Sequence, residues 1–475
     1  MRLAPDPHVG PEELERGKRA LINDAAWAST SGALYGGVIL IGFALELGAT
    51  PHHIGMLAAI PFLAQVAQLP AIALVERLRE RRKIAVLTVG ISRLLIASLA
   101  LLVLVPEKTV ALHLLLAAQV GIAFFGSVAG CSVNSWLHQL LAARGLGALF
   151  SQRLFWSTLL ASAAALAAGY AVQHWPTPNR LESYALSFVA AGVAGYISVY
   201  YLMRVPEPVM ARTGPRTPLF ALLRAPFVDA NFRRVIVFIT SWNFASNLAA
   251  PFLTVYLLQQ LGYGMGTVTT LWIASQMANA LTMYLWGRLS DRLSNKAILA
   301  VALPAYFGAL VAFPFAALPQ PHALTLPLLY VIHLTIGAAS GGIGLATGNL
   351  GLKLAPQGQG TAYLAAVGLA GATAAGLASI TGGVLAGWFA ARELSIFVHW
   401  AAPTEASSIT VLNFRHWHFL FGVSFALGAY VLHALSRINE GAEHSERRVM
   451  QELVAEAAAL MSPIGRLRDR RLRPR

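Results

Sequence analysis

One charged side chain lies deep inside an apolar stretch of this 475-residue chain. Arg93 comes about ten residues after Lys83, and at a rise of ~1.5 Å per residue this places it near the middle of a bilayer. A buried arginine keeps its charge, so it needs a carboxylate, water, polar oxygens or an anionic solute around it. Arg93 is therefore a substrate-anion site or a coupling element, or else a structural or snorkelling residue.

Carboxylates are rare inside the apolar stretches. Of 21 acidic residues, Asp24 and Glu46 fall in such stretches, each near one end of the first. A salt bridge with either acid would require Arg93 to reach along the helix axis. We therefore expect Arg93 to be surrounded by a solvated cavity or by serine, glutamine and carbonyl oxygens. Proton coupling would fall on Asp24 or on the imidazoles of His113 and His333, which titrate near physiological pH.

Polar and aromatic side chains recur at helical spacing within several apolar stretches. Side chains four residues apart share one face of a helix, so they can present flat rings and amides together. These residue types can hydrogen-bond a polar solute, but they also pack and tie helices together. The candidate solute-binding residues are Trp27, Ser31, Tyr35, Gln119, Trp242, Asn243, Asn247 and His333.

The elements that carry these residues are predicted to be membrane-spanning helices. The chain is 56% hydrophobic and 12% charged, whereas about a quarter of a soluble protein is charged. Apolar runs long enough to span a bilayer, about 20 residues, recur twelve times. The predicted spans are Leu21–Leu47, Ile54–Val75, Ile84–Val105, Val110–Val133, Leu154–Val172, Tyr184–Met203, Val235–Leu258, Val268–Trp286, Ala297–Leu318, Leu324–Gly348, Ala362–Trp388 and His416–Leu435.

The distribution of cations predicts the topology. With both termini inside, 30 of the 35 lysine and arginine residues fall in inside segments and 4 in outside loops. This asymmetry follows the positive-inside rule, which explains the net charge of +14 better than nucleic-acid binding does. The single cysteine, Cys131, lies in a predicted span, so no disulfide can form within the chain.

The two halves of the chain share a register. A shift of 215 positions places Asp291 on Glu76 and Trp242 on Trp27, at equivalent points of the hydropathy pattern. Such agreement predicts an internal repeat of six helices, which is one known way to build a transporter.

The polar loop between the eighth and ninth spans resembles the signature loop of the major facilitator superfamily. Its matching residues are Gly287, Asp291, Arg292 and Lys296, and a degenerate first copy contains Glu76 and Arg77. The segment from Trp136 to Arg153 is similar to a loop of a bacterial branch whose members mostly lack assigned substrates. The resemblance extends from about residue 20 to 437.

This resemblance implies an all-α membrane protein with twelve transmembrane helices in two six-helix repeats. It also implies a midplane cavity lined by the first and fourth helices of each half, and a cytoplasmic gate formed by the signature loops. The expected domains are a cytoplasmic N-terminal arm (1–19), two bundles (20–203 and 235–437), a cytoplasmic linker (204–234) and a basic cytoplasmic tail (438–475).

The predicted function is secondary active transport of a small organic solute by alternating access. The alternatives are a drug or metabolite exporter with a largely apolar pocket and a non-transporting receptor or scaffold of the same fold. We expect a monomer in a bacterial inner membrane, with protons as a possible partner and no nucleic acid. No enzyme motif, cofactor motif or compact metal-ligand cluster is present, so neither catalysis nor a cofactor or metal site is predicted.

Overall fold

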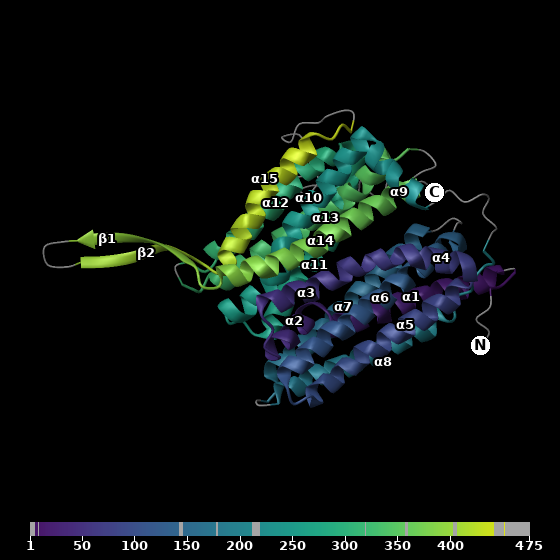
Figure 1. Cartoon of the computed structure of the whole chain (residues 1–475), viewed down its shortest axis with the longest axis horizontal. Coiled ribbons are helices and arrows are strands. Elements are labelled where there is room, and N and C mark those ends of the chain that lie inside the picture. Colours follow the sequence, from purple (N-terminus) through teal and green to yellow (C-terminus); the bar gives the residue numbers. More distant parts are fainter. Residues whose placement is uncertain are drawn as a thin grey trace, which may run out of the picture. The chain divides into compact units, whose positions relative to one another are not determined.

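The structure is a computed structural model of the 475-residue chain, and it is almost entirely helical (Figure 1). It describes residues 5–7, 9–141, 146–176, 179–210, 219–318, 320–356, 360–401, 406–440 and 451. Within these residues, eleven helical stretches are long and apolar enough to cross a membrane. Helix α11 (Met265–Arg292) supplies a further long helix at the eighth predicted span. The expected twelve-helix fold is confirmed.

The first repeat is built from α-helices and two short 3-10 segments, η1 and η2. In chain order they are α1 (Pro11–Tyr35), α2 (Gly37–Glu46), α3 (Pro51–Leu63), η1 (Ala64–Ala67), α4 (Gln68–Leu78), α5 (Arg81–Ser98), η2 (Leu99–Leu104), α6 (Lys108–Leu140), α7 (Leu146–His174) and α8 (Arg180–Leu202).

The second repeat follows a short helix, α9 (Leu219–Val228), which lies in the expected linker. Its elements are α10 (Ala230–Val255), the π-helical segment η3 (Tyr256–Gln260), α11, α12 (Asn295–Phe315), α13 (Thr325–Leu354), α14 (Gly360–Phe389), β1 (Glu393–Ala401), β2 (Ala406–Arg415) and α15 (Trp417–Ser436).

The first helix begins earlier than the hydropathy predicted. Pro11 opens α1, and Glu12 and Glu13 lie in its first turn. Proline is favoured at the first helical position, and carboxylates there interact favourably with the positive end of the helix dipole. Residues 11–19, which we expected to form an arm, are therefore already helical.

The first helix is also broken, a feature that was not predicted from the sequence. Gly36 is extended (φ −96°, ψ −170°), and Gly37 is left-handed (φ +54°). Glycine adopts such angles at little steric cost. The break interrupts the regular helical hydrogen bonds between the last carbonyls of α1 and the first amides of α2. It lies directly after Tyr35.

The chain divides into two compact units. Unit 1 comprises residues 1–216 with 251–270 and 379–387, and unit 2 comprises 217–250, 271–378 and 388–475. In unit 1, α1 packs against α7 and α8, and α5 packs against α6 and α8. In unit 2, α12 packs against α13 and α15.

An antiparallel β-hairpin, β1–β2, connects the last two helices, and it was not predicted from the sequence. Figure 1 shows it projecting from the ends of α14 and α15 within unit 2. Leu394, Ile396 and Val398 alternate along β1, and this period of two is the pattern of a strand with one apolar face. A hydropathy window long enough to detect a membrane span averages over this alternation of apolar and polar residues, so the hairpin does not show in it.

Helices α11 and α13 of unit 2 meet where Gly337 has no side chain. A Cβ atom at Gly337 would overlap the carbonyl oxygen of Ser275, whereas a Cβ at Gly344 on the same helix would meet nothing within 4 Å. Backbones can approach this closely in membrane helices because glycine has no side chain.

We predict that Gly337→Ala lowers the thermal unfolding midpoint of the purified protein, because overpacking a tight contact costs roughly 1–3 kcal/mol. The matched control Gly344→Ala should leave the midpoint unchanged or raise it, since alanine favours helix over glycine by roughly 0.5–1 kcal/mol. Equal midpoints for the two variants would contradict the predicted contact.

Candidate functional site

The polar residues predicted near Arg93 do come together in unit 1. Arg93 extends from α5, and its Nη1 donates to the Ser31 hydroxyl oxygen on α1, at 3.4 Å. Ser31 is completely buried. This is the kind of environment expected from the sequence, with side-chain oxygens next to the guanidinium.

A glycine provides the space through which Arg93 reaches α1. A Cβ atom at Gly195 of α8 would lie 2.5 Å from Arg93 Cδ and 3.1 Å from Ser31 Oγ. Any larger side chain at this position would therefore displace the arm of Arg93. The guanidinium is positioned jointly by α1, α5 and α8.

Two further predicted residues extend this cluster. Tyr35 of α1 interacts electrostatically with Arg93, and the Gln119 side chain of α6 lies within hydrogen-bonding reach of Tyr35. Gln119 is 4% exposed, and its Oε1 atom has no hydrogen-bond partner. A buried polar atom without a partner is costly, so such an atom indicates a missing ligand or water.

Asp24 lies on the same helix as Ser31, two turns closer to the N-terminus. The Ser198 hydroxyl of α8 donates to Asp24 Oδ1 at 2.7 Å. Arg153 of α7 and Arg93 both interact with the carboxylate electrostatically. Trp27, one turn before Ser31, is half-buried.

The predicted residues of the second repeat have a different environment. On α10 of unit 2, Asn243 Nδ2 donates to the Ile239 carbonyl, and Asn247 Nδ2 donates to the Asn243 carbonyl, both at 2.9 Å. A Cβ at Gly371 of α14 would lie 3.0 Å from Asn243 Nδ2. These amides satisfy the backbone of their own helix and support close packing against α14.

Aromatic packing surrounds the remaining two candidates. The Trp242 ring packs edge-on against Tyr306 and Phe307 of α12, with ring centroids 4.9 and 5.7 Å away. His333 is 1% exposed and lies against Trp272 and Phe313, and its Nδ1 lies 2.8 Å from the Leu329 carbonyl oxygen. His333 is buried in the packed interior of unit 2, whereas Trp242 is half-buried. Solute contact by either residue stays a prediction.

Most of the signature-loop residues belong to the ends of helices, where a loop between two spans was expected. Glu76 and Arg77 are near the end of α4, and Gly287 and Arg292 are near the end of α11. Asp291 is part of α11, but its side chain lies outside the described residues, as does part of the segment from Trp136 to Arg153. The gating role of Asp291 and Glu76 therefore stays a prediction.

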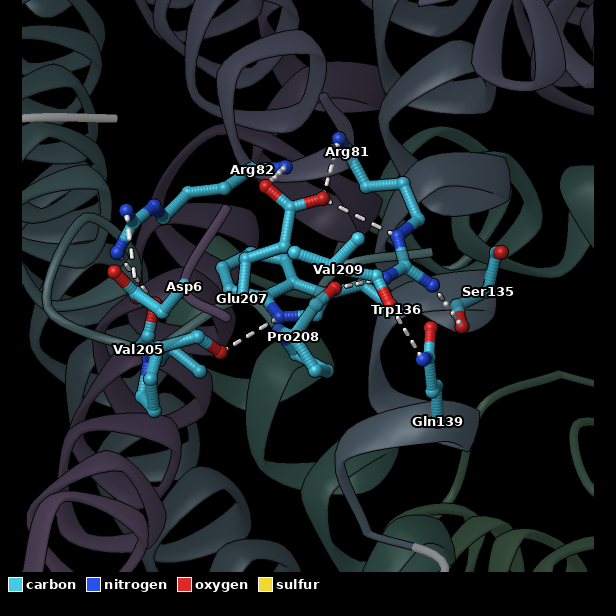
Figure 2. Close-up of polar contacts among 11 residues, drawn as sticks. Asp6, Arg81, Arg82, Ser135, Trp136, Gln139, Val205, Glu207, Pro208 and Val209 are labelled. Atoms are coloured by element: carbon cyan, nitrogen blue, oxygen red, sulfur yellow. Dashed lines mark hydrogen bonds and ion pairs between the residues drawn. The ribbon is translucent and has the colours of Figure 1, made fainter. Parts of the chain in front are cut away.

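A buried carboxylate that was not predicted from the sequence holds the start of the third helix of unit 1 (Figure 2). Glu207 follows α8 and is fully buried. Its two carboxylate oxygens accept the backbone amides of Arg81 and Arg82, the first two residues of α5, at 2.7 and 3.0 Å. A carboxylate at this position interacts favourably with the positive end of the helix dipole.

Further bonds fasten the segment around Glu207. The Arg81 guanidinium pairs with Glu207 at 3.2 Å and donates to the Ser135 and Pro208 carbonyls. Trp136 Nε1 donates to the Pro206 carbonyl at 2.9 Å (Figure 2). We call this set of contacts the Glu207 latch, because it ties the chain after the sixth helix to the third and fourth.

The second repeat contains the same arrangement with other residues. Glu440 follows α15 and accepts the amides of Asn295 and Lys296, the first residues of α12, at 3.1 and 2.7 Å. Lys353 Nζ of α13 lies 3.2 Å from its carboxylate. The predicted gating residue Lys296 is thus bound within its own unit, and its Nζ donates to Ser436 O. We call this set of contacts the Glu440 latch.

A sequence signal for both latches existed. Glu207 and Glu440 are each the first carboxylate after the sixth span of a repeat, and the third span of each repeat begins beside cations. The constant offset of 215 that aligns the signature loops does not align these two glutamates, because the repeats differ in length between the loop and the end of the sixth span.

Histidines approach one another at the start of α3. The His53 ring lies 6.3 Å from His52 and 6.1 Å from His113 of α6, between ring centroids. In the described part of the chain, no group of three or more histidine, cysteine or acidic side chains is arranged to hold a metal ion.

We predict that Glu207→Gln lowers the free energy of unfolding by roughly 3–5 kcal/mol, because it leaves the buried Arg81 without its counter-charge. The control is Glu80→Gln, which removes a half-exposed pair with Lys83 and should cost about 1 kcal/mol or less. Denaturant unfolding of the two variants makes the comparison. Similar losses for both would show that the latch contributes no more than a surface pair.

Glu440 gives a prediction for pH dependence. Burial raises the pKa of its carboxyl, but the hydrogen bonds from Lys296, Asn295 and Lys353 outweigh burial and hold that pKa below its ordinary value of 4.5. Its contribution to stability is therefore fully present above pH 4.5 and is lost as the pH falls through the folded pKa. The difference in unfolding midpoint between wild type and Glu440→Gln should be constant at neutral pH and shrink in acid. If the difference in unfolding midpoint grows in acid, the predicted role of the ionised Glu440 carboxylate is wrong.

Comparisons with known proteins agree with this fold. No curated protein sequence is significantly similar to the chain, but solved structures resemble it. The nucleoside transporter NupG is 13% identical, with a TM-score of 0.61 over 90% of this chain and 100% of that one. A bacterial homologue of the iron transporter ferroportin is 13% identical, with a TM-score of 0.64 over 89% and 98%. A D-xylose–proton symporter is 14% identical, with a TM-score of 0.61 over 88% and 96%.

At sequence identities this low, the similarity to these structures shows the fold alone. The sequence itself matches the model of the Major Facilitator Superfamily over residues 25–382, which is most of the chain. Together with the two six-helix repeats and the signature loop, this match establishes that the chain belongs to the Major Facilitator Superfamily.

Proposed function

We propose that this secondary transporter moves a small organic solute by alternating access and binds it in unit 1, beside the break in the first helix. The observation that carries the proposal is the cluster of Ser31, Tyr35, Arg93 and Gln119, contributed by three helices. In membrane proteins, polar groups at this depth and broken helices both mark solute pathways.

Space next to the break supports a binding role. Gly37 is exposed, and a Cβ atom added at Gly32 or Gly37 would meet nothing within 4 Å. The half-buried ring of Trp27 and the phenol of Tyr35 lie on the same helix face as Ser31. A polar solute fits this lining better than the apolar ligand of a drug exporter would.

The remaining parts of the proposal concern setting and gating. The protein acts as a monomer in a bacterial inner membrane. Both of its termini lie in the cytoplasm, an orientation that the distribution of cations favours. Asp291 and Glu76 act as gates on the cytoplasmic side, and the two latches hold the next helices along the chain, α5 and α12. Trp242, Asn243, Asn247 and His333 complete the solute pathway from the second repeat.

Uptake by purified protein in vesicles tests the function. Sugars, amino acids and amphipathic cations are offered with and without a pH gradient. For any transported solute, we expect Trp27→Ala and Asn243→Ala to reduce uptake by about tenfold while expression stays nearly normal, as for the loss of a contact worth ~1.4 kcal/mol.

The control is Thr30→Ala on the same helix as Trp27, because Thr30 is buried, bonds to the Ala26 carbonyl and is not among the residues proposed to contact the solute. This variant should transport normally. Normal transport by Trp27→Phe, combined with misfolding of the alanine variants, would show that these residues are packing elements. Absence of flux for every solute would favour the non-transporting receptor.

A further inference from the structure

The charge around Arg93 is not balanced. Its guanidinium contacts the neutral Ser31 hydroxyl, and its buried Nε has no hydrogen-bond partner. Among the described residues, no carboxylate lies within the 4.0 Å limit of an ion pair with Arg93. An arginine cannot lose its charge in a protein, and a buried charge is stable when it is paired.

The acid that acts on Arg93 is shared with a second cation. Asp24 is bound by Ser198 of α8, and it interacts electrostatically with Arg153 of α7 as well as with Arg93 of α5. The two arginines and one carboxylate carry a net positive charge whether or not the carboxylate is protonated.

Two other features of the site suit an anion. Helix α2 begins at Gly37, directly after the break that follows Tyr35, and its N-cap, Gly36, provides no side-chain capping bond. The unpaired first amides of a helix attract negative charge. The buried amide of Gln119, which lies next to Tyr35, can donate to the anion through its nitrogen, while its partnerless Oε1 can accept from water or from a protonated group.

We propose that the site at Arg93 takes the anionic group of an organic acid, and that Asp24 takes up a proton when this anion binds. This inference rests on the proposed transport function and narrows the solute to organic acids. The ionised Asp24 carboxylate competes with a solute anion for the field of Arg93. Protonation removes that competition, so proton and anion each favour binding of the other. The two then move together, as a symport.

Matched pairs of an acid and its neutral analogue test the solute class. Benzoate is compared with benzamide, lactate with lactamide, and gluconate with glucitol, by thermal unfolding of the purified protein. At least one acid should raise the unfolding midpoint, while its neutral analogue does not. If no acid stabilises the protein more than its analogue, the proposal is wrong.

Variants test the role of Arg93. Arg93→Gln should weaken binding of the stabilising acid by about 10- to 100-fold, as for the loss of a charged hydrogen bond. Arg204→Gln is the matched control, because Arg204 is exposed and packs over Tyr200 outside the site; it should bind normally. Gly195→Ala keeps the charge but displaces the arm of Arg93, so it should also weaken binding, even if Arg93→Gln fails to fold. Binding that survives in both site variants overturns the proposal.

The proton role has its own readout. Asp24→Asn mimics the protonated acid, so it should bind the solute anion at all pH values, whereas wild type binds more weakly as the pH rises. Loss of anion binding in Asp24→Asn would overturn the switch. An acid that binds through Arg93 without being transported would leave this site standing and refute the transport function. Transport of neutral solutes alone would support the transport function and refute the anion site at Arg93.

Discussion

The interior of a bilayer offers no water to polar groups, and this constraint explains most of the polar structure seen here. Side chains in the spans bond to their own helix, as Thr30 does to Ala26 and Ser246 does to Trp242. Ser187 instead bonds across helices to the Leu34 carbonyl. Arg93 Nε and Gln119 Oε1 depart from this pattern, as do His333 Nε2 and Thr347 Oγ1 in the second repeat. The chain retains them at a cost in stability, and such costs are usual at binding sites.

The two repeats solve one problem in the same way with different residues. In each, the third helix begins with unpaired amides, and a glutamate after the sixth helix accepts two of them. Glu207 is fully buried and paired with Arg81, whereas Glu440 is paired with the half-exposed Lys353. Both latches fasten the last helix of a repeat to its third, which stiffens the bundle as one body. Alternating access requires bundles that move as units.

The repeats differ in charge at membrane depth. Unit 1 contains Asp24 and Arg93 within its spans, whereas the corresponding first helix of the second repeat carries the neutral amides of Asn243 and Asn247. Those amides are used by their own helix backbone. The chemistry of charge recognition is therefore concentrated in the first repeat, and the second contributes packing, aromatic surface and neutral hydrogen-bonding groups.

The sequence by itself determined the class of protein, the spans and the family, because hydropathy and the position of cations are properties of contiguous residues. It also identified Arg93 as the charge at depth and placed Ser31 and Tyr35 on one face. It did not predict the break at Gly36, the hairpin after α14 or the latches.

Tertiary structure decided the partners. Ser31 lies 62 positions from Arg93, and Glu207 lies 126 positions from Arg81. Which side chains meet over such separations depends on which faces of the helices pack together, and on glycines such as Gly195 that let one arm pass. Periodicity in one helix states which residues share a face, but it cannot state which other helix that face will contact.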